Sequence, residues 1–131
     1  TLEEMKMINE TKKILHMPNL SVAATCVRLP VVSGHSESVF IEIDQDGISV
    51  SDIRAILESA KGIKVQDNPA KQEYPMPLFA EGEDDVFVGR IRKDLSNDRG
   101  FHMWIVSDNL LKGAALNSIQ IAEAMIEEGI I

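Results

Sequence analysis

Arg28 and His35, two side chains with complementary chemistry, lie close together in the stretch from Ala24 to Ser38. An arginine is a permanent cation whose rigid fork binds a carboxylate through two parallel hydrogen bonds. A histidine exchanges a proton near neutral pH and therefore suits general acid–base work. Gly34 precedes His35, so the backbone can turn tightly there and leave the imidazole accessible. The pair predicts a site for a small acidic metabolite.

The segments around these two residues predict how the side chains are held. Residues 20–29 and 38–44 have the composition of strands. The proline, serine and glycine of residues 30–34 supply the chemistry of a turn between them. We expect Arg28 near the end of the first strand and His35 on the returning arm, so that both lie at the tip of a sheet.

The remaining segments predict an α+β domain with helices packed on one face of a mainly antiparallel or mixed sheet. Residues 66–85 are polar and rich in proline, and we expect a mostly irregular connection there. The other expected elements are a helix from Thr1 to about Leu15, a helix from Ser49 to about Gly62 with Val50, Ile53, Ile56 and Leu57 inward, a strand at 63–65, a hairpin of strands 86–93 and 101–107, and a helix at 108–128 with a stripe of Leu111, Ala115, Ile119, Ala122 and Ile126.

Composition excludes several classes of protein. A formal net charge of −8 over 131 residues disfavours binding to nucleic acid or to an anionic membrane. Cys26 is the single cysteine, so no internal disulfide is expected, and no secretory signal or membrane-length apolar run is present. We therefore expect a reducing, cytoplasmic setting. No cluster of cysteine and histidine predicts a metal site, and no glycine-rich phosphate loop occurs.

Residues 24–38 resemble the substrate loop of the aspartate-semialdehyde dehydrogenase family. Three more blocks resemble that family in the same order: Glu3-Glu4-Met5-Lys6, Gly89-Arg90-Ile91-Arg92-Lys93-Asp94 and Ser107-Asp108-Asn109-Leu110-Leu111-Lys112-Gly113-Ala114-Ala115. The resemblance covers nearly the whole chain but only the C-terminal half of the family. It implies that residues 1–131 form a catalytic and dimerisation domain, like the C-terminal domain of glyceraldehyde-3-phosphate dehydrogenase, whose helix at 108–128 packs on an absent nucleotide-binding domain.

The resemblance also implies a role for each of five residues. Arg28 would bind the substrate carboxylate, Glu3 its ammonium group, and Lys6 inorganic phosphate. His35 would move the proton, and Asn109 would contact the nicotinamide cofactor, NADP. The implied reaction interconverts aspartyl phosphate and aspartate semialdehyde on the route to lysine, threonine and methionine. The expected partner is a second copy, in a homodimer or homotetramer that pairs through the sheet face.

Cys26 does not fit the nucleophile of this family. Its apolar neighbours in the expected strand predict a buried, inert thiol. The family's attacking cysteine belongs to an Asn-Cys motif in the first half, and no Asn-Cys occurs here. The isolated segment is therefore expected to be inactive.

Other interpretations stay open at this point. Three other classes of protein would each fit part of the pattern. They are a thiol enzyme that uses Cys26 with His35, an N-acetyl-glutamyl-phosphate reductase, and a non-catalytic binding or assembly module.

Arg90 and Arg92 are expected on one strand face, with Gly89 and Ile91 on the other. They would either position anionic groups or pair with acids across the sheet, and the pairing is preferred.

Overall fold

The computed structural model describes residues 1–131 and divides into two compact units, Thr1–Pro30 and Val31–Ile131, each described here by itself. The first unit holds the helix α1 (Leu2–Ile14). Thr1 caps it with Glu4 in a reciprocal capping box.

The predicted strand at residues 20–29 is wrong, because this segment is irregular throughout. A strand requires a neighbour that exchanges backbone hydrogen bonds with it, and no ladder forms here. One backbone group in the segment instead bonds to a side chain, since the Cys26 N–H donates to Glu4 Oε1 at 3.0 Å. The segment is therefore tied to α1 by a single contact of this kind.

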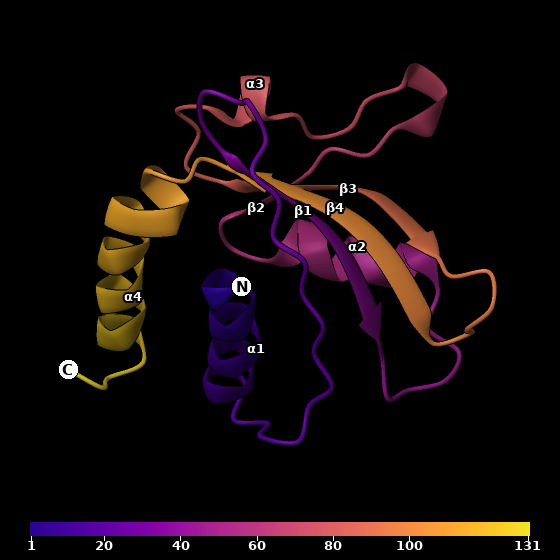
Figure 1. Cartoon of the computed structure of the whole chain (residues 1–131), viewed down its shortest axis with the longest axis horizontal. Helices are drawn as coiled ribbons and strands as arrows, with labels where there is room; N and C mark the ends of the chain where they lie inside the picture. The colour runs from indigo at the N-terminus through magenta and orange to yellow at the C-terminus, as the bar shows by residue number, and fades with distance from the viewer. The chain divides into compact units, whose positions relative to one another are not determined.

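The second unit is built on a four-stranded mixed sheet, which confirms the predicted class (Figure 1). The strand order is β1-β4-β3-β2, with β1 paired antiparallel to β4, β4 antiparallel to β3, and β2 parallel to β3. The bounds of the strands are β1 (His35–Glu42), β2 (Ile63–Val65), β3 (Val86–Lys93) and β4 (Gly100–Ser107). Strand β1 corresponds to the strand predicted at residues 38–44, but it begins earlier and includes His35.

Helix α2 (Val50–Ser59) covers one face of the sheet (Figure 1). Its Ile53 is buried against Val88, Phe101 and Met103, and this cluster is the main core of the unit. Ser49 caps the helix in a second capping box. The pattern correctly predicts this inward face except at Ile56, which is 62% exposed.

The opposite face of the sheet carries the segment between β2 and β3. This segment is mostly irregular, as predicted, with a 3₁₀ turn, η1 (Pro69–Lys71), and one short helix, α3 (Pro77–Ala80). Ala80 packs with Phe87 and Val106 in a second, smaller cluster, against which Trp104 lies. The Trp104 indole N–H donates to the Pro75 carbonyl at 3.0 Å, so this connection is anchored to β4.

The hairpin between β3 and β4 is fixed by a carboxylate. Asp94 accepts hydrogen bonds from the backbone N–H groups of Ser96 and Asn97, and its other oxygen lies 2.7 Å from His102 Nε2. The contact with His102, followed by that with Ser96, lowers the pKa of Asp94 below its ordinary value. The turn-rich sequence predicted the hairpin, which the structure confirms.

The C-terminal helix starts with an irregular turn. Residues Leu111–Ala115 form a wide π-helical turn, η2, before the regular helix α4 (Leu116–Glu127). Gly129 follows the end of the helix with a φ of +68°. No residue of α4 is buried, and Ile119 and Ile126 of the predicted stripe are exposed.

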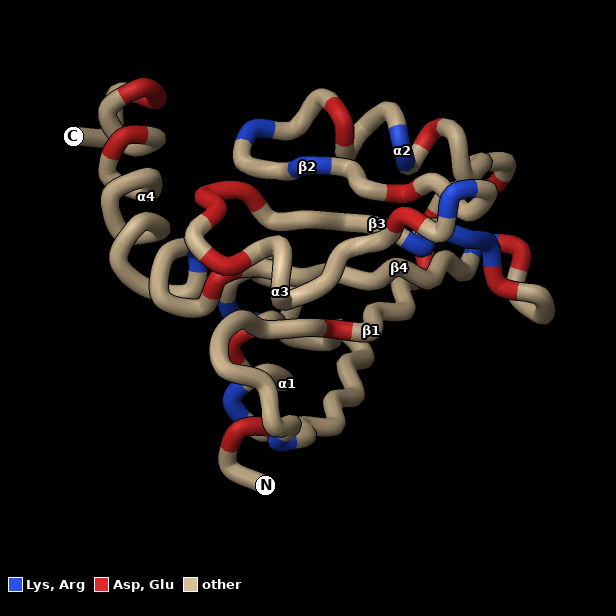
Figure 2. Tube along the Cα trace, turned by 90° about the horizontal axis from the view of Figure 1, so that it is seen from above, with Lys and Arg blue, Asp and Glu red and all other residues tan.

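Charge is unevenly spread over the second unit. The turn between α3 and β3 carries Glu81, Glu83, Asp84 and Asp85, and acidic residues are also scattered along the chain (Figure 2). Lys and Arg residues gather near the ends of β3 and β4, where acidic residues lie among them (Figure 2). None of the helices combines the length and the apolar character needed to cross a membrane.

Gly89 lies where β3 and the preceding connection approach most closely. A Cβ atom at this position would lie 2.2 Å from the Gln66 carbonyl oxygen and 2.5 Å from Pro75 Cδ. We expect Gly89→Ala to lower the free energy of unfolding by about 3 kcal/mol, at the upper end of overpacking costs. Urea denaturation of the purified protein measures this change.

Gly113→Ala is the matched control for this prediction. The nearest atom to a Cβ at Gly113 is Asn109 Cβ at 3.8 Å, so the methyl group has room. The substitution also removes the helical penalty of glycine, about 1 kcal/mol, so stability should stay level or rise. Equal unfolding midpoints for Gly89→Ala and the unmodified protein would contradict the close approach.

Candidate active site

His35 begins β1 and is held by the neighbouring strand. It is paired in register with Ser107 at the end of β4, and its residue is exposed. Gly34, directly before it, has a φ of +89°. A Cβ at Gly34 would lie 3.3 Å from the Ser107 carbonyl oxygen and 3.4 Å from Pro77 Cβ. Glycine is therefore required for the turn that presents His35, in agreement with the sequence prediction.

Asn109 lies beside this turn, a contact that the sequence did not predict. Its Oδ1 accepts a hydrogen bond from the Gly34 backbone N–H at 2.7 Å. The two residues are far apart in the chain, so only the pairing of β1 with β4 brings them together. No sequence spacing signals such a contact.

Asp108 holds the backbone that follows Asn109 and ties it to Gly82. This carboxylate is buried, with 5% of the residue exposed, and it accepts hydrogen bonds from the backbone N–H groups of Gly82, Leu110 and Leu111. These three bonds, led by the one from Gly82, lower the pKa of Asp108 below its ordinary value. Asp108 therefore caps the turn that follows it and ties that turn to the acidic segment at Gly82.

The first unit holds the other three predicted site residues. Glu3 and Lys6 form an exposed ion pair on α1, with Lys6 Nζ 3.4 Å from Glu3 Oε1. Arg28 is exposed and forms no ion pair within the chain. The predicted position of Arg28 at the end of a strand is wrong, because residues 20–29 form no strand. His35 and Asn109 belong to the second unit, so the structure groups the five residues as three and two.

Cys26 is exposed rather than buried, which corrects the prediction of a core thiol. The expected burial depended on a strand that does not form. Its sulfur lies 3.5 Å from the Met7 thioether, which cannot act as a base. No basic side chain bonds to the thiol, so nothing in this unit activates Cys26 as a nucleophile.

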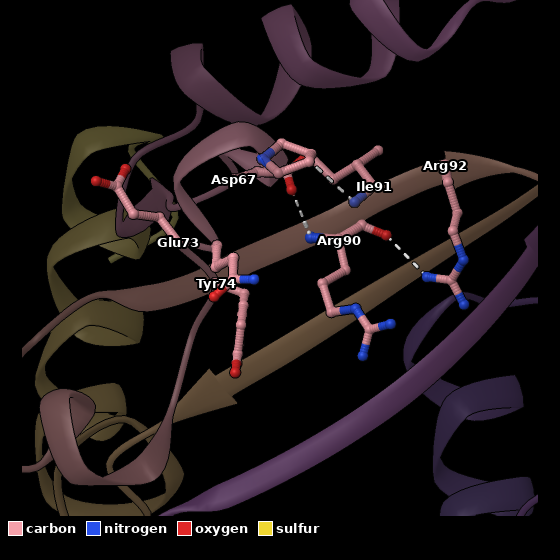
Figure 3. Close-up of a pocket in the computed structure, with 8 residues that line it drawn as sticks. Asp67, Glu73, Tyr74, Arg90, Ile91 and Arg92 are labelled. Carbon is pink, nitrogen blue, oxygen red and sulfur yellow. Dashed lines mark hydrogen bonds between the residues drawn. The ribbon is translucent and has the colours of Figure 1, made fainter.

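A buried carboxylate organises a pocket on the second unit. Asp67 accepts hydrogen bonds from the backbone N–H groups of Arg90 and Ile91 at 2.8 and 3.3 Å (Figure 3). It also pairs with Arg54, whose guanidinium nitrogen lies 2.6 Å from Asp67 Oδ2. The neighbouring pocket has a volume of about 540 Å³ and is lined by Tyr74, Arg90 and Arg92 among others. Sequence reasoning placed Asp67 in an irregular connection and missed this role.

Arg90 and Arg92 behave differently from the prediction. Arg90 has a φ of +52°, and the register of β3 shifts between Gly89 and Arg92, so regular alternation is broken. Gly89 therefore faces Pro75, whereas Ile91 packs into the main core with Val88 on the opposite face. Neither arginine pairs with an acid, and Arg92 donates to the Arg90 carbonyl at 2.9 Å. The preferred pairing across the sheet is wrong.

No three His, Cys, Asp or Glu side chains are grouped so that they could hold a metal ion.

The chemistry available at the start of β1 is that of an accessible imidazole on a fixed backbone, next to an amide side chain. Such an arrangement can move a proton to or from a molecule bound beside it.

Comparison with known proteins defines the class. Residues 1–112 match the family model described as the semialdehyde dehydrogenase dimerisation domain. The chain is 67% identical over 125 residues to the aspartate-semialdehyde dehydrogenase of Bacillus subtilis (strain 168), which covers 95% of this chain and 36% of that protein. It is 54% identical over 131 residues to the enzyme of Aquifex aeolicus (strain VF5), covering 100% of this chain and 38% of the relative.

Solved structures agree with these relatives. The crystal structure of aspartate semialdehyde dehydrogenase II from Vibrio cholerae complexed with ASA superposes with a TM-score of 0.88 at 41% identity, over 97% of this chain and 37% of that one. The enzyme from Candida albicans with NADP superposes with a TM-score of 0.79 at 31% identity, over 98% of this chain and 43% of that one.

The chain therefore belongs to the semialdehyde dehydrogenase dimerisation-domain family. Its relatives are aspartate-semialdehyde dehydrogenases, and it matches their C-terminal part. The chain spans a little over a third of the length of these relatives, at 36% and 38%.

Asp108→Asn tests the support beneath Asn109. An asparagine offers one acceptor oxygen, and its amino group would face a backbone N–H donor, so at least one bond is lost. The folded pKa of Asp108 lies below the unfolded value of about 3.9, so the carboxylate stabilises the fold above that pH. This contribution disappears as the pH falls through the folded pKa. We expect Asp108→Asn to lower the thermal unfolding midpoint at pH 7, with a difference from the unmodified protein that shrinks below about pH 4.

Asp84→Asn serves as the control, because the Asp84 carboxylate is exposed and accepts no hydrogen bond. This variant should unfold like the unmodified protein across the same pH range. A constant midpoint difference for Asp108→Asn from neutral to acid pH would contradict the role given to the charged carboxylate.

Proposed function

We propose that this chain is the substrate-binding and dimerisation part of an NADP-dependent aspartate-semialdehyde dehydrogenase. The reaction would convert aspartate semialdehyde, phosphate and NADP to aspartyl phosphate and NADPH, in cytoplasmic lysine, threonine and methionine biosynthesis. The observation that carries the proposal is 67% identity to the Bacillus subtilis enzyme across 95% of the chain. The nucleophilic cysteine would come from the rest of the protein.

His35 would act as the acid–base group of this reaction. Its backbone is fixed by pairing with Ser107, and its side chain is exposed, so the imidazole can reach a bound substrate. In the first unit, Arg28 has no acidic partner and its fork is free to bind the substrate carboxylate. Glu3 would bind the ammonium group and Lys6 the phosphate, each after leaving a weak, exposed ion pair.

The residues near His35 also fit a nicotinamide cofactor. The Asn109 Oδ1 is occupied by the Gly34 N–H, so its amide nitrogen can donate to a cofactor oxygen. NADP would accept the hydride that the semialdehyde gives up when it is oxidised. The exposed apolar residues of α4, including Ile119 and Ile126, would pack on the nucleotide-binding domain.

A second copy would cover the sheet face that carries α3. This face presents an apolar pocket of about 370 Å³ lined by residues including Pro75, Met76, Leu78 and Trp104. Leu78 and Phe79 are 72% and 60% exposed, and exposed apolar groups of this kind mark association surfaces. The matching family is described as a dimerisation domain, which supports a copy of the same chain as the occupant.

The substrate roles are tested by two substitutions in the full-length protein. With aspartate semialdehyde, phosphate and NADP, we expect His35→Asn to lower kcat by roughly 10²- to 10⁴-fold, because proton transfer is lost. Arg28→Lys should instead raise KM for the semialdehyde by about 10- to 100-fold, because one charged hydrogen bond is lost. The initial rate of NADPH formation, followed by its absorbance, reports both changes.

Each variant has a matched control. His16→Asn replaces a histidine with a φ of +54° by a residue that tolerates this conformation, and it should leave kcat unchanged. Arg99→Lys changes an arginine that pairs with Glu42, at the far end of β1 from His35, and it should leave KM unchanged. Full activity of His35→Asn would refute the assignment of the acid–base residue.

The dimer surface is tested by Leu78→Glu combined with Phe79→Glu. Two carboxylates on α3 would have to be desolvated in the interface, so we expect the dissociation constant of the dimer to rise at least about tenfold. Sedimentation over a range of protein concentrations measures it. Leu95→Glu is the control, because Leu95 is fully exposed in the hairpin turn. Unchanged association of the double variant would place the interface elsewhere.

A further inference from the structure

One side-chain amide joins the C-terminal segment to the turn before His35. The Gly34 backbone N–H donates to Asn109 Oδ1 at 2.7 Å. Because an N–H group can bond only to the oxygen of an amide, the contact fixes the orientation of the Asn109 side chain. Its Nδ2 makes no hydrogen bond to another protein group.

The surroundings make this contact decisive for the turn. Outside the β1–β4 ladder that begins at His35, this is the only hydrogen bond made by residues 31–34. On the other side, Asp108 fixes the backbone next to Asn109 through its bonds to Leu110 and Leu111. The amide oxygen therefore extends from a rigid support to a segment that has little support of its own.

We propose that Asn109 is a positioning residue for His35, acting through the Gly34 backbone. Its oxygen holds the Gly34 turn that leads into β1, from which His35 projects, and its nitrogen remains free for the carboxamide oxygen of a nicotinamide. The second half of this statement rests on the proposed function; the first half rests on the geometry alone. Because one planar amide carries both groups, binding at the nitrogen orders the oxygen as well. Cofactor binding thereby holds His35 in place.

Two substitutions separate the oxygen from the nitrogen. Asn109→Ala removes both groups, whereas Asn109→Asp keeps an acceptor for Gly34 and loses the donor. In the full-length protein, hydrogen–deuterium exchange at the Gly34 amide should quicken at least about tenfold in the alanine variant, as the bond that protects it is lost. The aspartate variant should keep the protection.

Kinetics then distinguish positioning from simple structural support. Both variants should raise KM for NADP, because both lose the donor nitrogen. At saturating NADP, kcat of Asn109→Ala should fall at least about tenfold below that of Asn109→Asp, since only the alanine variant releases the turn before His35. Asn97→Ala is the matched control: Asn97 Oδ1 accepts the Arg99 N–H at 2.9 Å in the β3–β4 hairpin, so its loss should lower stability without changing Gly34 exchange or kcat.

Unchanged Gly34 exchange in Asn109→Ala would overturn the inference, and so would an equal fall of kcat in both variants. A failure of the proposed function would be seen in a different measurement, the activity of the unmodified protein. If the unmodified full-length protein does not oxidise aspartate semialdehyde, the function is wrong, while exchange at Gly34 still decides whether Asn109 holds the turn.

Discussion

The antiparallel ladder between β1 and β4 is the constraint on which the second unit depends. Its pairing runs from Glu42 opposite Gly100 to His35 opposite Ser107, so an error of one position would exchange the two faces of β1. The correct register places Val39 and Ile41 against the core beneath α2. The same register brings the turn at Gly34 to the side chain of Asn109 and so links core packing to the site.

A second constraint is the buried carboxylate of Asp67. It satisfies two backbone N–H groups at the irregular part of β3 and pairs with Arg54, so its burial is compensated by charged hydrogen bonds. These bonds hold Arg90 in a left-handed conformation that costs a side-chain-bearing residue about 1–3 kcal/mol. The irregularity in turn directs the side chains of Arg90 and Arg92 toward a pocket instead of an acidic partner.

The uncovered apolar surfaces have a common physical basis. Helix α4 buries none of its residues, and α3 exposes Leu78 and Phe79. Apolar surfaces of this kind contribute to stability only when another surface covers them and removes them from water.

The sequence by itself determined the local features: the capping boxes at Thr1 and Ser49, the β3–β4 hairpin, the glycine before His35 and the end of α4 at Gly129. Each depends on a few neighbouring residues, so its physical cause is contained in a short stretch. Only the tertiary structure decided that residues 20–29 form no strand, that Cys26 is exposed, and that Asn109 meets Gly34. These features depend on which distant backbone groups find partners, and strand pairing across the whole chain settles that question.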